Sequence, residues 1–176
     1  MPIEEVQKGT ASDGRGIVLL VPPLADRSKP TVSELTASGV MRITYGLATD
    51  GYDHQTDIAK ITTGRYTLEQ ALTLDGKITD TITFKYVYNR DEPTAVEEAL
   101  GTPGVDYDIV HILGYPNDHV IDEDTKINSI VPITTSIPTD IPPAENTELM
   151  KQMVPNVRGK AYREHEITVV AGGSGD

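Results

Sequence analysis

The stretch from Ile78 to Tyr88 constrains the fold more than any other, because polar and apolar residues alternate along most of it. One face carries the apolar and aromatic side chains of Ile78, Ile82, Phe84, Tyr86 and Tyr88, and the other carries Thr79, Thr81, Thr83 and Lys85. A period of two is typical of a β-strand with one covered and one polar face. Threonine and aromatic residues also favour strands. The sequence therefore predicts a strand here.

Similar patterns along the chain predict a mainly β protein of about eight strands. Further strands are expected at Gly16–Pro23, Met41–Tyr52, Val105–Leu113, residues 126–137 and Tyr162–Val170. A polar loop is expected at Asp50–Lys60, and Asp75-Gly76 predicts a hairpin turn. Short helices are expected at Pro30–Leu35 and Pro93–Leu100. Because helices do not alternate with strands, we expect a β-sandwich or barrel with one short flanking α-helix and a long inter-strand loop.

The length of 176 residues predicts one domain of ordinary size. We expect a flexible N-terminal arm at 1–16, a single β-sandwich domain at 17–171 and a flexible glycine-rich tail at 172–176. The longest apolar run, Ile17–Val21, is too short to cross a bilayer, so no membrane anchor is expected. The start, MPIEEVQKG, lacks the features of a signal peptide.

Charge is distributed unevenly. The formal net charge of −12 argues against a protein that grips nucleic-acid phosphates. From Asp91 to Thr125 there is no Lys or Arg, but there are ten acids: Asp91, Glu92, Glu97, Glu98, Asp106, Asp108, Asp118, Asp122, Glu123 and Asp124. Four basic residues, Lys151, Arg158, Lys160 and Arg163, gather later in the chain. The acidic stretch is either a solvated surface or one half of a match between subunits, with these four as candidate inter-subunit basic residues.

No catalytic constellation is visible. The chain has no Cys, and its four His are far apart in sequence. Asp53, His54 and Asp57 offer metal-ligand chemistry, but a solvated polar loop explains them more simply. An acidic turn at 118–124 lacks the spacing of an EF-hand calcium loop. We expect no enzyme activity, no catalytic residues, no metal and no cofactor.

Three stretches resemble the major tail protein, or tail tube protein, of long-tailed bacteriophages. They are PTVSELTASGVMRITYGL, ITDTITFKYVYNRDEPTAVEEAL and NVRGKAYREHEITVVAGG. Together the similarity covers residues 17–171. It implies a β-sandwich or barrel subunit that assembles into rings, usually hexamers, which stack into a hollow tube.

The same resemblance implies partners and location. The tube would enclose the tape-measure protein, meet tail terminator and baseplate proteins, and conduct DNA without binding it specifically. The protein would belong to the virion tail, after assembly in the host cytoplasm. Residues 1–16 and the loop around Asp50–Gly64 fit flexible arms that bridge one ring to the next.

Polar strand faces next to the lumen would suit such a conduit, because acidic and neutral walls do not retain phosphates. The candidate lumen-facing residues are Thr79, Thr81, Thr83, Asp106 and Asp108. The alternative is another structural or adhesive β-sandwich module, such as a shaft, virion decoration or carbohydrate-binding protein. The absence of Trp makes a carbohydrate-binding protein the weaker choice.

Overall fold

The computed structural model describes residues 8–67 and 69–172, which fall into two compact units. Unit 1 comprises residues 8–46, 105–133 and 158–172, and unit 2 comprises residues 47–67, 69–104 and 134–157. Each unit is built on an antiparallel sheet, and the helices are few and short. The mainly β class predicted from the sequence is confirmed. Most of the predicted N-terminal arm (1–7) and C-terminal tail (173–176) lies outside the described residues.

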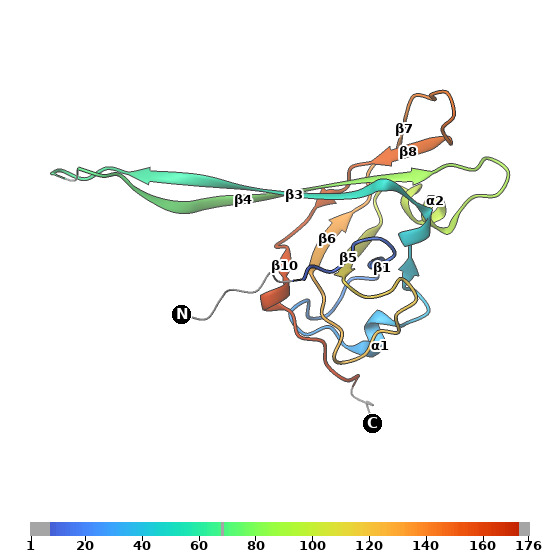
Figure 1. Cartoon of the computed structure of the whole chain (residues 1–176), viewed down its shortest axis with the longest axis horizontal. Helices are drawn as coiled ribbons and strands as arrows, with labels where there is room; N and C mark the ends of the chain where they lie inside the picture. Colours follow the sequence, from blue (N-terminus) through green and yellow to red (C-terminus); the bar gives the residue numbers. More distant parts are fainter. Residues whose placement is uncertain (1–7, 68, 173–176) are drawn as a thin grey trace. The chain divides into compact units, whose positions relative to one another are not determined.

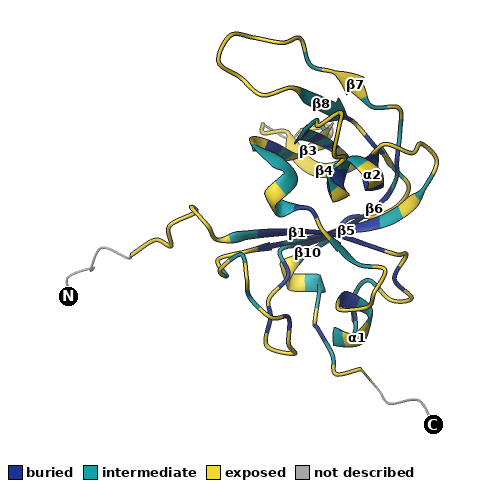
Figure 2. Cartoon of the chain, turned by 90° about the vertical axis from the view of Figure 1, so that its right-hand side faces the viewer, coloured by how far each residue is buried: buried dark blue, intermediate teal, exposed yellow. Residues whose placement is uncertain are grey.

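The sheet of unit 1 has the strand order β10-β6-β5-β1-β2. The strands are β1 (Gly16–Val21), β2 (Met41–Arg42), β5 (Asp106–Leu113), β6 (Ser129–Thr134) and β10 (Tyr162–Arg163). β1 pairs along its whole length with β5, from Gly16 opposite Leu113 to Val21 opposite Asp108. Figure 2 shows both strands largely as buried, which explains why β1 is a run of apolar residues rather than an alternating one.

One face of this sheet packs against a short helix and several loops. The core cluster includes Ile17, Leu19, Val21, Leu24, Leu35, Val110, Ile112, Ile121, Ile127, Ile130 and Val169. Leu35 comes from α1 (Val32–Leu35), which begins with a capping box. Thr31 Oγ1 accepts from the Glu34 N–H, and Glu34 Oε2 accepts from the Thr31 N–H. The bonds that the Glu34 carboxylate accepts from the Thr31 N–H and the Thr31 hydroxyl hold the pKa of Glu34 below its usual value. The two bonds from backbone N–H groups satisfy donors that a helix start leaves free.

The sheet of unit 2 has the strand order β3-β4-β8-β7. Its strands are β3 (Leu47–Thr63), β4 (Leu72–Val87), β7 (Thr139–Asp140) and β8 (Met150–Met153). The short strand β9 (Asn156–Val157) follows β8 in the chain and is not part of this sheet. The helix α2 (Ala95–Leu100) starts at the cap Thr94 and ends at Gly101, as the sequence predicts within two residues. Of the predicted apolar face, Ile82, Phe84 and Tyr86 are fully buried, whereas Tyr88 is half-buried and Ile78 is exposed.

Several local predictions are wrong. The expected polar loop at Asp50–Lys60 is strand β3, because cross-strand bonds to β4 outweigh its polar composition. Asp75-Gly76 is not a hairpin turn but lies within β4, and residues 64–71 connect the two strands. The expected strand Met41–Tyr52 is interrupted by the 3-10 turn η1 (Thr44–Gly46). The expected strand Tyr162–Val170 ends at Arg163, where the 3-10 turn η2 (Glu164–Glu166) begins.

Candidate assembly interface

β3, β4 and their connection form a long hairpin, here called the arm (Figure 1). The neighbouring strand β8 pairs with β4 only from Phe84 to Val87. From Leu72 to Thr83, therefore, the arm consists of two strands in the part of unit 2 that the structure describes. A two-stranded hairpin is only marginally stable by itself in water. Its length makes the arm the first candidate for an assembly element.

One face of the arm is polar, and we call it the threonine face. Thr79, Thr81 and Thr83 of β4 lie directly opposite Asp57, Gln55 and Asp53 of β3. Thr79 and Thr81 are exposed and Thr83 is half-buried. Sequence reasoning found the three threonines but missed their β3 partners, which it placed in a loop. Asp53, Gln55 and Asp57 lie at alternate positions, which is the pattern of one strand face. The residues between them are also polar, so the sequence shows no apolar face that would mark a strand.

The opposite face of the arm carries a small polar network. Asp80 Oδ1 lies 2.9 Å from His54 Nε2 and accepts a 2.7 Å hydrogen bond from Thr56 Oγ1. At the base of the arm, Lys85 donates to the Asp50 carboxylate and holds the pKa of Asp50 below its usual value. These contacts fix the pairing of the two strands.

A change of register divides the arm into two parts. Ile58 lies opposite Ile78, but Lys60 lies opposite Asp75, so β4 has one residue more than β3 between these pairs. Such a bulge shifts the alternation of the longer strand. A Cβ at Gly76 would lie 3.0 Å from the Ala59 carbonyl oxygen, so the bulge holds a residue without a side chain.

The bulge places exposed apolar residues on opposite faces of the arm. Ile58 and Ile78 lie on the face of the polar network, next to the Asp80 and Thr56 pair. Leu74 lies opposite Ile61, and Leu72 lies opposite Thr63, on the face that continues the threonine face outward. Ile61, Leu72 and Leu74 are 51%, 53% and 60% exposed. We call these three residues the apolar end of the arm.

The two predicted lumen-facing acids of β5 are not equivalent. Asp106 is exposed, as expected for a residue that borders water. Asp108, by contrast, is 0% exposed, so its assignment to a lumen surface is wrong. It accepts from the Leu24 N–H at 2.8 Å and from Arg27 Nε at 2.9 Å, and Arg158 Nη2 lies 3.3 Å away. The reason is the central position of β5, between β1 and β6, where side chains on both faces can be covered.

The four candidate basic residues have partners within their own units. Arg158 pairs with Asp108 and donates from Nε to the Ile133 carbonyl. Lys160 pairs with Glu166, and Lys151 Nζ lies 4.1 Å from the centroid of the Tyr88 ring. Arg163 lies in β10, where its N–H donates to Glu166. The charges of Arg158 and Lys160 are therefore partly neutralised before any contact with a second copy.

Within residues 8–67 and 69–172, no group of three or more His, Asp or Glu is placed to hold a metal ion. His54 contacts Asp80 rather than Asp53, and Asp53 Oδ2 accepts from Gln55. No helix in these same ranges has the length and apolar character needed to cross a membrane.

Similar solved structures include two chains of the anti-feeding prophage. A chain of the anti-feeding prophage baseplate has 8% identity and a TM-score of 0.48, with 89% of this chain and 98% of that chain covered. A chain of the anti-feeding prophage tube-terminating cap has 13% identity and a TM-score of 0.45, with 92% and 96% covered. A sequence comparison with curated proteins finds no match. Residues 4–167 match the phage tail tube protein family. The chain therefore belongs to the phage tail tube protein family and is a structural component of a phage tail.

Proposed function

We propose that this chain is the tube subunit itself: copies assemble into rings, hexameric by analogy with the family, and the rings stack into a hollow tail tube. The tube encloses the tape-measure protein and later conducts DNA. It meets a terminator at one end and a baseplate at the other. The role is mechanical and non-enzymatic.

The arm is the observation that carries this proposal. The twelve residues from Leu72 to Thr83 continue beyond the last contact with β8, which corresponds to about 40 Å at ~3.3 Å per residue. Both of its faces hold exposed apolar side chains, which cost free energy in water. An isolated subunit has no use for such an extension. In an assembly, neighbouring copies cover it and gain a contact far from the body of the subunit.

The threonine face supports a lumen lined by neutral and acidic groups. It carries hydroxyl, amide and carboxylate groups, including those of Asp53 and Asp57. Six copies at −12 each give 6 × −12 = −72 per ring. Counter-ions screen this field with a decay length of about 8 Å at physiological salt. In a narrow channel the phosphates stay close enough to the wall to be repelled. DNA would pass such a wall without being held.

Negative-stain electron microscopy of the purified chain at increasing concentration tests the proposal. We expect rings or tubes of uniform diameter, together with a rise in sedimentation coefficient as concentration increases. Addition of salt should change the onset of assembly but not the diameter. A chain that stays monomeric at the highest soluble concentration would contradict a self-assembling tube subunit and would favour the alternative, a decoration or adhesive module.

A further inference from the structure

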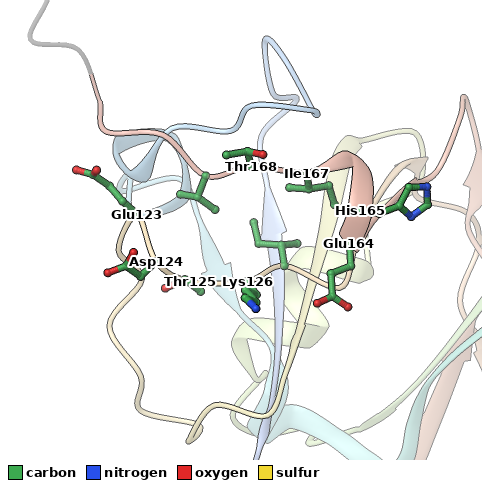
Figure 3. Close-up of a pocket in the computed structure, with 10 residues that line it drawn as sticks. Glu123, Asp124, Thr125, Lys126, Glu164, His165, Ile167 and Thr168 are labelled. Atoms are coloured by element: carbon green, nitrogen blue, oxygen red, sulfur yellow. The ribbon is translucent and has the colours of Figure 1, made fainter.

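Unit 1 carries a groove of about 600 Å³ that the tube function described above does not use. Two segments line it, residues 123–127 and residues 164–169. Its floor is apolar, with Ile127 and Val169 buried and Ile167 half-buried. In Figure 3, Glu123 and Asp124 lie at one end of the groove and Glu164 with His165 at the other.

The rim of the groove is acidic, and its carboxylates are exposed to a binding partner. Glu123, Asp124 and Glu164 are exposed, and among the side chains that the structure describes none of the three forms an ion pair. Lys126 is the only Lys or Arg among the lining residues. The groove therefore combines an apolar floor with an excess of negative charge at its edges.

The tip of the arm carries a basic side chain next to exposed aromatic and apolar side chains. Tyr66 is 98% exposed, and Arg65 beside it is exposed without an ion pair among the described residues. The apolar end, Ile61, Leu72 and Leu74, lies directly behind this tip on one face. Tyrosine and arginine are the residue types that most often dominate protein interfaces, and an isolated protein rarely gains from exposing them together.

We propose that the end of the arm of one copy docks in this groove of a second copy. Tyr66 and the apolar end cover the floor formed by Ile127, Ile167 and Val169, and the Arg65 guanidinium meets the acidic rim. The contact is head-to-tail, since arm and groove are different surfaces, and such contacts build closed rings or open stacks. This inference rests on the proposed self-assembly and names the two surfaces that perform it.

Two matches favour a second copy as the occupant. Apolar surface meets apolar surface, and a cation meets an unpaired anionic rim, so both the burial and the charge are complementary. The bulge at Gly76 contributes directly, because it brings Leu72 and Leu74 to the same face as Ile61. If the two strands instead paired regularly through Gly76 at unchanged chain length, Leu72 and Leu74 would lie on the face opposite to Ile61.

The absence of cysteine allows a direct test by site-specific cross-linking. Gly64→Cys and Thr168→Cys each introduce the one thiol of its chain, at the arm tip and at the groove, and a Cβ at Gly64 meets nothing within 4 Å. The two variants are mixed under assembling conditions and treated with a short bismaleimide. We expect a cross-linked dimer of one copy of each. Tyr45→Cys, at a position in unit 1 that is 80% exposed, replaces Gly64→Cys in the control and should give no such dimer.

Assembly is monitored in the same samples by electron microscopy. Assemblies that form without the 64–168 cross-link would overturn the docking proposal and leave the tube function intact. Cross-linking between the two sites would support it. Failure of wild-type protein to assemble at all would instead count against the proposed function, and with it this inference.

A charge exchange gives an independent readout. Arg65→Glu should weaken assembly by about tenfold in critical concentration, a typical effect for reversal of an interfacial charge. Glu164→Arg should do the same from the other side. The double variant should recover a large part of the loss, because the pair is restored with reversed signs. Additive losses in the double variant would show that these residues do not meet.

Discussion

Arg158 Nη2 lies 3.3 Å from Asp108 Oδ1, and this contact joins a late segment of unit 1 to the middle of strand β5. The carboxylate also accepts from Arg27 and from the Leu24 N–H, so one buried acid holds three separate parts of the unit. The Arg158 side chain is partly exposed whereas Asp108 is not. The pair is therefore a structural element of the subunit, not a free charge at its surface.

Replacement of Asp108 should destabilise unit 1 strongly. Asp108→Ala removes the acceptor of a buried N–H and leaves two arginines without their partner, a loss of about 3 kcal/mol in the free energy of unfolding. Urea unfolding followed by circular dichroism measures it. The matched control is Asp106→Ala, an exposed acid on the same strand and 3.9 Å from Arg158, which should cost less than about 1 kcal/mol. Equal losses would contradict the role assigned to Asp108.

An inserted residue should turn the end of the arm over. Insertion of one alanine after Ala59 supplies β3 with the residue it lacks opposite the bulge, so regular pairing resumes. Ile61, Leu72 and Leu74 would then move to the opposite face. We expect normal monomer stability by thermal melting but no assembly by sedimentation velocity.

Deletion of Gly76 is the control for this insertion. It removes the bulge from β4 but keeps Ile61 opposite Leu74 and on the same face. This variant should assemble far better than the insertion variant. If both variants assemble equally well, it does not matter for assembly which face of the arm carries the apolar end.

Tyr86 should make the protein sensitive to alkali. Its side chain is fully buried, its hydroxyl has no hydrogen-bond partner among the described residues, and burial raises its pKa from 10.0 to about 12, with Glu97 and Asp140 adding to the shift. A raised pKa means that the folded state favours the neutral phenol. The stabilisation is complete below pH 10 and is lost as the pH rises from 10 towards 12.

Tyr86→Phe should therefore lose less stability than the wild type over this range. At neutral pH the substitution should change the free energy of unfolding by less than about 1 kcal/mol, since it removes an unpaired group. Thermal melts of both proteins between pH 8 and 12 would show the two curves diverging only in the alkaline range. Parallel curves would contradict the raised pKa.

Positive charge on the threonine face should impair DNA passage without preventing assembly. Thr79→Lys with Thr81→Lys places two cations opposite Asp57 and Gln55. If this face borders the lumen, phage carrying the variant should form tails but eject DNA more slowly, as measured by release of a dye-labelled genome. Thr73→Lys, on the other face of the arm, is the comparison. Equal ejection from both would place the threonine face outside the channel.

The sequence predicts the best-patterned elements well. Ile78–Tyr88 alternates in residues of high β propensity, and Thr94 and Gly101 delimit α2, so local signals and tertiary contacts agree. The threonines of the arm could be assigned to one face for the same reason. The family resemblance also came from these stretches, and the family match confirms it.

The failures have a common physical cause. Residues 55–60 are all exposed, on both faces of the arm, and a strand without a buried face has no apolar alternation to detect. Asp75-Gly76 has the composition of a turn, but the same residues suit a bulge. Asp108 alternates like a surface residue, and only the fold shows that Arg27 and Arg158 reach it.

The bulge at Gly76 has a consequence for tails that meet in one host cell. Two phages whose subunits differ by a single inserted codon in β3 would present the apolar end of the arm on opposite sides. Their subunits would fail to co-assemble although every contacting side chain is identical. Incompatibility between closely related tails would then arise in one genetic step, and a compensating insertion would reverse it.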